Sequence, residues 1–342
     1  MKQPLIILTG PTAVGKTALS IELAKALNGE IISADSMQVY RHMDIGSAKI
    51  MPEEMEGVPH HLIDVLEPWE EFNVTRFQSM AKEAMAGIYS RGHVPIVTGG
   101  TGFYIQALAY DIDFTENEDH SGIREKLEQL AAEKGEEHLH QMLAEIDPES
   151  AEAIHANNVK RVIRAIEYYR LTGEKISEHN KREREKQSPY DLYYYVLTRD
   201  RAALYERIDR RVDIMMEQGL VDEVKHLKEM GCTRDMVAMQ GLGYKEILDY
   251  LDGRISLEEA VYIIKRDTRH FAKRQLTWFK RERDVRFIAV DDKNALWRHQ
   301  TADADSQEDD QKKILEYIYK DYFGGRNEHG TCLLYTSPSP RD

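Results

Sequence analysis

The stretch Gly10-Pro11-Thr12-Ala13-Val14-Gly15-Lys16-Thr17 decides the fold class of this 342-residue chain. It fits the pattern G-x-x-x-x-G-K-[ST] at every position, and in this pattern loop amides and a helix N-terminus cradle phosphate oxygens. Lys16 then neutralises the phosphates, and the Thr17 hydroxyl is placed to hold Mg²⁺. The stretch predicts a binding loop for a diphosphate or triphosphate, but it does not say which reaction follows.

The flanking sequence places this loop in an α/β domain. Residues 5–8 form a short apolar run that enters the loop, and helical spacing of apolar residues follows up to Asn28-Gly29. Residues 31–32 begin a second strand that leads to Asp35, and residues 94–97 form a third that enters another glycine loop. Strands alternating with helices predict a parallel sheet flanked by helices, as in P-loop NTPases. Ligands bind beyond the carboxyl ends of such strands, so both loops and Asp35 are expected to converge.

The middle of the chain differs from the flanking α/β sequence in its composition and in the spacing of its apolar residues. Residues 116–189 are highly charged, with apolar residues at three- and four-residue spacing, which predicts a small helical insertion. A strand at 193–197 and two long helices near 201–230 and 256–283 follow. We therefore expect a catalytic core from residues 1–115 and 190–322, interrupted by the insertion.

Two segments near the end of the chain stand apart. The acidic stretch 303–310 holds five acids and no base, which predicts a solvated loop or linker. The last eleven residues, 332–342, resemble a translated sequencing adaptor, so we leave them out of the fold and expect the native terminus to be lost or replaced.

Composition narrows the class further. The two cysteines, Cys232 and Cys332, lie far apart and lack metal-ligand spacing, which argues against a disulfide framework and a zinc module. No apolar run could cross a membrane, and no signal peptide is recognisable, so we expect a cytoplasmic protein. We also expect a monomer, although these observations do not bear on the oligomeric state. The net charge of −14 speaks against a nucleic-acid partner, but residues 265–286 carry nine Lys/Arg against three acids. A locally basic face on an acidic protein can still bind phosphate chains.

Asp35 and the second glycine loop leave alternatives open. Asp35 can act as a general base aimed at the phosphate site, or it can cap a helix. The loop 98–104, Thr-Gly-Gly-Thr-Gly-Phe-Tyr, can approach a ligand closely and donate its hydroxyls to a leaving diphosphate. It can equally be a simple strand–helix turn.

Several motifs in order resemble the bacterial form of the tRNA dimethylallyltransferase (IPP transferase) family. Besides the phosphate-binding loop they are A-D-S-M-Q-V-Y (34–40), P-H-H-L-I-D (59–64), G-G-T-G-F-Y (99–104), R-I-D-R-R-V-D (207–213), Q-G-L-G-Y-K-E (240–246) and R-Q-L-T-W-F (274–279). Together they span residues 5 to about 285, whereas a generic nucleotide kinase would share only the first.

The resemblance implies an activity. A family member moves a dimethylallyl group from dimethylallyl diphosphate to the N6 amine of the adenosine at position 37, next to the anticodon, in tRNAs that read codons beginning with U. It implies that residues 10–17 grip the diphosphate, with Mg²⁺ as cofactor. Asp35 matches the general base, Thr101 matches the residue that bonds the bridging oxygen, and Lys16 stabilises the departing charge.

The resemblance also implies residues that contact tRNA. They are Asp35, Ser36, Met37, Gln38, Thr101, Arg124, Val159, Lys160, Arg161, Val162, Ile163, Arg274, Gln275 and Trp278. Gln38 suits recognition of a base edge. The spacing of Val159, Val162 and Ile163 equally fits a helix core, and the basic segment 265–286 could be a solvated helix face.

Three rival functions remain for the residues alone. The first is prenyl transfer to free AMP, which would need neither the insertion nor the basic segment. The second is a small-molecule P-loop kinase, which leaves the motifs at 99–104 and 274–279 unexplained. The third is a non-catalytic RNA-binding module, against which the intact Lys16, Thr17, Asp35 and Thr101 argue.

Overall fold

The computed structural model describes residues 2–114, 122–290 and 307–327. The chain divides into two compact units: residues 1–109 with 190 onward form the first, and Tyr110–Pro189 form the second. The sequence had placed the second unit at 116–189. The adaptor-like segment 332–342 lies outside the described residues.

The first unit is built on one parallel sheet of six strands in the order β3-β2-β4-β1-β5-β6. This confirms the predicted P-loop-type α/β class. β3 and β6 were not predicted as strands, because β3 is only two residues long and β6 lies in a charged context. The strands are β1 (Pro4–Thr9), β2 (Gly29–Ala34), β3 (His60–His61), β4 (Val94–Gly99), β5 (Asp191–Thr198) and β6 (Val285–Ala289).

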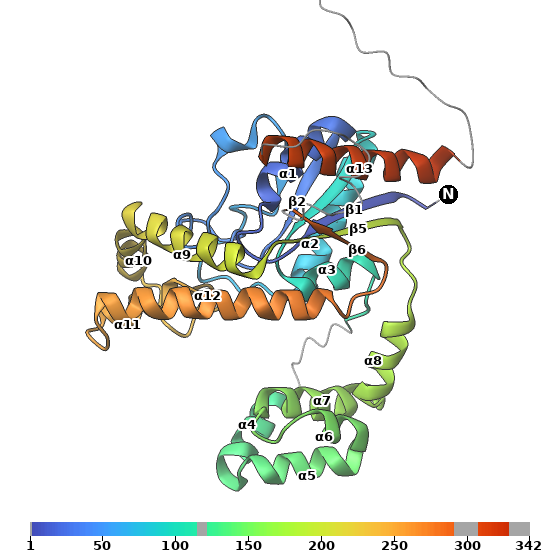
Figure 1. Cartoon of the computed structure of the whole chain (residues 1–342). Helices are drawn as coiled ribbons and strands as arrows, with labels where there is room; N and C mark the ends of the chain where they lie inside the picture. Colours follow the sequence, from blue (N-terminus) through green and yellow to red (C-terminus); the bar gives the residue numbers. More distant parts are fainter. Residues whose placement is uncertain (1, 115–121, 291–306, 328–342) are drawn as a thin grey trace, which may run out of the picture. The chain divides into compact units, whose positions relative to one another are not determined.

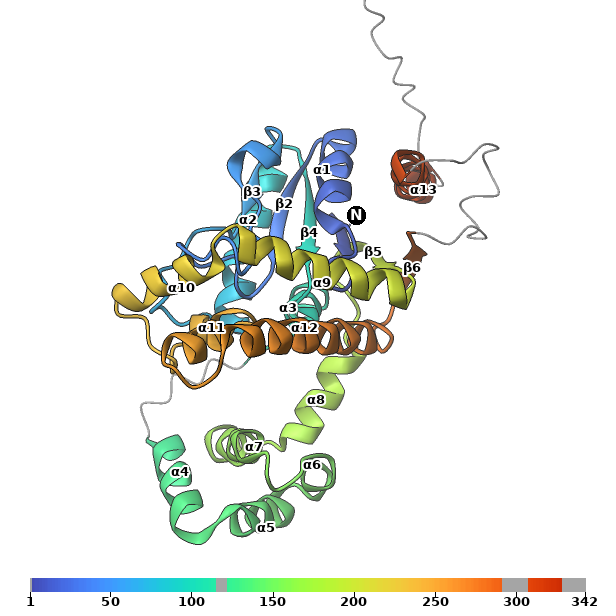
Figure 2. The same cartoon turned by 60° about the vertical axis from the view of Figure 1, so that its left-hand side comes forward.

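Helices cover both faces of the sheet (Figures 1 and 2). α1 (Lys16–Leu27) and α13 (Gln307–Asn327) pack together on one face, and α2 (Val74–Ser90) packs on the other with α3 (Gly102–Ala109). Successive residues of a strand point to opposite faces, so Ile6 and Leu8 of β1 join the core under α1. Burial on both faces explains why the strand reads as an unbroken apolar run.

The helices after β5 differ from the prediction in one respect. The helix expected near 201–230 is two helices, α9 (Arg201–Glu217) and α10 (Leu220–Glu229). Gly219 separates them with a φ of 99°, a left-handed value that glycine adopts without strain. α11 (Tyr244–Leu251) and α12 (Leu257–Phe279) follow, and α12 runs alongside α9 (Figure 2). Two short 3₁₀ helices cover Pro52–Met55 and Ala238–Gln240.

The prediction for the acidic stretch 303–310 is also wrong in part. α13 begins at Gln307, so the last four residues of the stretch are helical and not a linker; residues 303–306 lie outside the described part. Among the described residues, no helix is both long and apolar enough to cross a bilayer.

The second unit consists of five helices within its described residues. A small apolar core joins α4, α5, α6 and α7, and Val162 and Ile163 lie inside it at 0% and 3% exposure. Their side chains pack the core, which confirms the helix-core alternative, and their contact with tRNA stays a prediction; Val159 is partly buried against the same core. The helices are α4 (Ile123–Lys134), α5 (Glu136–Ile146), α6 (Pro148–Ala153), α7 (Val159–Thr172) and α8 (Ile176–Glu185).

Candidate active site

The phosphate-binding loop connects the end of β1 to the start of α1. Gly15 has a φ of 111°, and α1 begins at the next residue, Lys16. A β-carbon on Gly10 would lie 2.5 Å from the carbonyl oxygen of Leu197 on β5, so no larger residue fits there. The two glycines thus let the loop turn tightly over the sheet edge and aim its amides at a ligand.

Lys16 is held inside this loop. Its Nζ donates to the carbonyl oxygens of Gly10 and Pro11 at 3.0 and 2.9 Å. Burial lowers the pKa of Lys16 to about 8, and the charge of Arg211 lowers it further, while Asp35 acts in the opposite direction. An incoming phosphate would favour the charged form, because an anion stabilises a cation that burial destabilises.

A cavity of about 640 Å³ opens beside Lys16 at the carboxyl edge of the sheet. The loop, the end of β2, the second glycine loop, α9 and α12 all contribute to it. The expected convergence of Asp35 with both glycine loops is therefore confirmed. The lining includes Thr12, Ala13, Gly15, Lys16, Thr17, Ser33, Asp35, Gln38, Thr98, Gly99, Gly100, Arg207, Arg210, Arg211, Gln275 and Gln311.

Three arginines of α9 were not predicted as site residues. Arg207 donates its Nε to the carbonyl of Ala13 at 3.0 Å, which fixes it against the loop. Arg211 makes no hydrogen bond or ion pair with the described residues, and burial lowers its pKa while Asp35 opposes the shift. With Arg210 they give the cavity a positive wall suited to a diphosphate. Their spacing of three and four on a helix was the sequence signal that could have revealed them.

Asp35 caps a turn, because no helix begins directly after β2, so the helix-cap alternative is wrong and the general base stays a prediction. Its Oδ1 accepts from the backbone N–H groups of Met37 at 2.9 Å and Gln38 at 3.4 Å, a capping-type arrangement. Within the described residues, Oδ2 has no hydrogen-bond partner, and the residue lines the cavity. One oxygen fixes the carboxylate, which leaves the other available as a proton acceptor.

The residues after Asp35 are held in place by the neighbouring loop. Gln38 donates both amide hydrogens to the carbonyls of Ser47 and Ala48, at 3.4 and 3.1 Å, and its Oε1 accepts from Ser33 at 3.3 Å. Any recognition of a base edge by Gln38 must therefore use the remaining lone pair of Oε1. Met37 packs on Gly241, and Ser36 does not line the cavity.

The second glycine loop reaches the cavity through other residues than Thr101. Gly99 and Gly100 line it, but Thr101 does not. The amide of Thr101 donates to the carbonyl of Ala34 at 3.2 Å, and its own carbonyl accepts the first bonds of α3. Thr98 lines the cavity with a buried hydroxyl that has no partner among the described residues.

Thr17 fits the expected magnesium ligand. Its hydroxyl has no hydrogen-bond partner in the described parts and faces the cavity. Among all the described residues, no three His, Cys, Asp or Glu side chains cluster closely enough to hold a metal ion. Mg²⁺ commonly keeps several waters and binds through substrate phosphates with one or two protein ligands, so a single hydroxyl here is sufficient.

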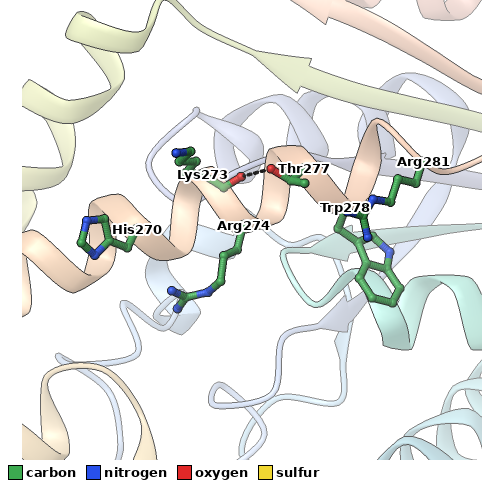
Figure 3. A pocket seen from close by; sticks show the side chains of 6 residues that line it. All are labelled: His270, Lys273, Arg274, Thr277, Trp278 and Arg281. Atoms are coloured by element: carbon green, nitrogen blue, oxygen red, sulfur yellow. Dashed lines mark hydrogen bonds between the residues drawn. The ribbon is translucent and has the colours of Figure 1, made fainter. Parts of the chain in front are cut away.

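A second pocket, of about 410 Å³, lies on the outer face of α12 (Figure 3). Four basic residues on or near this helix, Lys265, Arg266, Arg269 and Arg286, are paired with Asp213, Asp267, Asp209 and Asp321. Lys273, Arg274 and Arg281 form no ion pair with the described residues and instead line this pocket with His270, Thr277 and Trp278. Free cations beside an aromatic ring are suited to phosphates and stacked bases.

Gln275 does not belong to that outer face. It is 5% exposed and bonds to the two glycine loops, so little of its side chain is open to tRNA. Arg274 and Trp278, its neighbours on α12, do line the outer pocket.

The remaining predicted RNA residues lie in the second unit. Lys160 and Arg161 are exposed at the start of α7. Arg124 pairs with the buried Glu167 through two bonds of 3.0 and 2.7 Å, while about half of its side chain stays exposed. Arg124 therefore has a structural partner besides any role toward RNA.

The fold and the cavity define a phosphate-binding enzyme of the P-loop class. Comparison with known families narrows this class: the sequence profile described as IPP transferase matches residues 38–282, and that of isopentenyl transferase matches 3–66. The chain belongs to the IPP transferase family.

Similar proteins are described as tRNA-modifying enzymes. The chain is 65% identical over 293 residues to the tRNA dimethylallyltransferase of Lachnoclostridium phytofermentans, covering 86% of this chain and 94% of that one. It is 55% identical to the Carboxydothermus hydrogenoformans enzyme of that name over 288 residues, 84% and 92% of the two chains.

Solved structures agree in fold. The tRNA isopentenylpyrophosphate transferase of Bacillus halodurans has a TM-score of 0.69 at 44% identity, covering 96% of this chain and all of that one. A eukaryotic dimethylallyltransferase, described as acting on tRNA, has a TM-score of 0.75 at 33% identity, covering 84% and 74%.

Proposed function

We propose that this chain transfers a dimethylallyl group from dimethylallyl diphosphate to the N6 amine of the adenosine at position 37 of tRNAs that read codons beginning with U, releasing diphosphate. One observation carries the proposal: Asp35, whose Oδ2 has no hydrogen-bond partner among the described residues, lines the same cavity as the phosphate-binding loop. A kinase would need this loop for a transferred phosphate, but here the loop serves a leaving group.

The reaction forms a bond between N6 and the allylic carbon and breaks the bond from that carbon to the diphosphate oxygen. The adenine amine is a weak nucleophile, because its lone pair is delocalised into the ring. Asp35 accepts the N6 proton through Oδ2 as the bond forms, which avoids a cationic product. Lys16, the loop amides and the α9 arginines stabilise the charge on the departing diphosphate. Mg²⁺ held by Thr17 would neutralise part of that charge.

The contact of Thr101 with the bridging oxygen stays a prediction within this proposal. Thr101 is partly exposed and follows Gly100, which lines the cavity, at the junction of β4 and α3. Asp35 and Lys16 keep the roles that the family resemblance implies.

The acceptor is a macromolecule. The outer pocket on α12 offers Lys273, Arg274 and Arg281 for phosphates and Trp278 for a stacked base, which a free nucleotide would not require. Lys160 and Arg161 of the second unit supply further exposed positive charge. Flipping an unpaired loop base costs roughly a few kcal/mol, which such interactions can offset. A tRNA substrate is consistent with the expected cytoplasmic location.

A transfer assay tests the proposal. The chain is purified without its last eleven residues, 332–342. It is then incubated with labelled dimethylallyl diphosphate, Mg²⁺ and either unmodified tRNA or AMP. Label is expected in tRNA and not in AMP. Label found only in AMP supports the rival AMP transferase, and absence of transfer to any tRNA overturns the proposal.

A further inference from the structure

Gln275 joins the two loops that surround the proposed leaving group. From near the C-terminal end of α12, its Nε2 donates to the carbonyl of Gly100 at 2.9 Å, and its Oε1 accepts from the backbone N–H of Thr12 at 2.9 Å. Thr12 belongs to the phosphate-binding loop and Gly100 to the second glycine loop. A β-carbon on Gly100 would lie 2.2 Å from Nε2, so the loop approaches the amide as closely as glycine permits.

The chemistry of this bridge requires an amide. One end must donate and the other must accept, because a backbone carbonyl lies on one side and a backbone N–H on the other. A carboxylate would face the carbonyl of Gly100 with a second acceptor, and an apolar side chain would leave both backbone groups unpaired. Leaving a buried polar group unpaired is unfavourable, because the group has lost its bonds to water and gained none in the protein.

We propose that Gln275 is a positioning residue of the diphosphate site: it sets the separation of the two glycine loops and does not contact tRNA. The proposal rests on the proposed function for its ligand, the diphosphate of the prenyl donor. Arg274 and Trp278 on the same helix line the outer pocket. One rigid element therefore carries the RNA-facing side chains and the bridge between the loops.

Gln275→Glu and Gln275→Leu test this assignment in the full chain. Binding of inorganic diphosphate with Mg²⁺ is measured by calorimetry from about pH 5 to pH 8, and tRNA binding is measured in parallel. At pH 8 both variants are expected to bind diphosphate roughly tenfold or more weakly than the wild type, the fold-change that one missing buried bond produces. Affinity for tRNA alone is expected to stay within about twofold, because Gln275 is buried away from the outer pocket.

The pH dependence separates positioning from simple loss of packing. A protonated glutamic acid has one donor and one acceptor, so it can restore both bonds. Burial raises the pKa of such a carboxyl above its ordinary value of about 4.3. Affinity of Gln275→Glu, relative to the wild type, is therefore expected to recover as the pH falls and to exceed that of Gln275→Leu, whose relative affinity stays flat.

Gln311→Glu is the matched control for charge. Gln311 lines the same cavity from α13, but its side chain makes no hydrogen bond with the described residues. Gln311→Glu introduces the same negative charge into the cavity without removing the two bonds to the loops. Its loss of diphosphate affinity at pH 8 should therefore be smaller than that of Gln275→Glu. If Gln275→Leu binds diphosphate like the wild type, or if tRNA affinity falls instead, the positioning role is overturned. A wild type that binds diphosphate but modifies no tRNA would refute the proposed function and leave this comparison intact.

Discussion

The two pockets of the first unit are built differently. In the cavity over the sheet, the side chains are already held by hydrogen bonds to the protein before any ligand binds. Lys16 donates to carbonyls of the phosphate-binding loop, Arg207 donates to the carbonyl of Ala13, and Gln275 bonds to both glycine loops. In the outer pocket of α12, Lys273 and Arg274 have no ion-pair partner among the described residues. Bond making needs dipoles fixed before the reaction, whereas binding a polyanion needs mainly unneutralised charge. Substitutions in the cavity over the sheet should therefore impair transfer or diphosphate binding, whereas substitutions in the outer pocket should weaken tRNA binding.

The largest effect is expected from Asp35→Ala. Loss of the proton acceptor should lower single-turnover transfer by roughly two to four orders of magnitude, the usual contribution of general acid–base catalysis. Affinity for tRNA should persist, because the outer pocket is unchanged. Transfer of labelled prenyl group and tRNA binding by filter retention measure the two quantities separately.

Asp35→Asn is the matched control. It keeps an oxygen that can accept from the amides of Met37 and Gln38, as Oδ1 does now, but it cannot take a proton. It should therefore be as slow as the alanine variant while its fold is better preserved. An asparagine variant with normal turnover would assign Asp35 to capping alone.

The next effect concerns the pKa of Lys16. Burial and Arg211 place this pKa at about 8, so the charge that binds diphosphate is lost as the pH rises through 8. Arg211→Gln removes one lowering influence, so the alkaline fall in diphosphate affinity should move to higher pH. Overall affinity should also drop roughly tenfold or more, because one charge-assisted bond is missing.

Arg210→Gln gives the reference for this shift. Arg210 lines the cavity, but it is not among the charges that perturb Lys16. Its variant should bind diphosphate more weakly without displacing the pH profile. Calorimetry at matched pH values, relative to the wild type, cancels the titration of diphosphate itself. Equal profiles for the two variants would contradict the assigned influence of Arg211.

A smaller effect is expected in the outer pocket. Lys273→Gln and Arg274→Gln should each weaken tRNA binding several-fold at low salt and reduce the salt slope by about 0.7–1 for each phosphate that is no longer neutralised. Diphosphate affinity should not change. Lys265→Gln is the control, because Lys265 is already paired with Asp213 at 2.6 Å. If it alters the slope as much as the other two, the distinction between paired and free cations fails.

Much of the fold and part of the site could be predicted from local patterns. The phosphate-binding loop, four of the six strands of the sheet and the convergence of Asp35 with both glycine loops follow from local patterns of a few residues. The break at Gly219 was missed, because apolar spacing continues through it and a single glycine can be tolerated within a helix.

The side-chain partners could not be predicted in this way. Arg211 reaches the cavity from far along the chain, and Gln275 turns inward while its neighbours Arg274 and Trp278 turn outward. Which side of a helix faces a ligand depends on packing between elements that are distant in sequence. The resemblance to a family pointed to the segment 274–279, and the folded structure shows that Arg274 and Trp278 line one pocket while Gln275 lines the other.

The second unit offers the smallest expected effect on transfer and repeats the same contrast on one helix, α7. Val162 is fully buried in the small core, whereas Lys160 is exposed two residues earlier. Val162→Ala should destabilise this unit by roughly 1–3 kcal/mol, since truncating a buried side chain removes apolar packing and leaves a cavity. Lys160→Ala should change stability by less than about 0.5 kcal/mol but reduce the salt slope of tRNA binding.

Hydrogen exchange of α5 and α7 amides in the full chain reports the stability of this unit. If Val162→Ala instead leaves exchange unchanged and weakens tRNA binding directly, Val162 binds RNA after all, and burial is not its role.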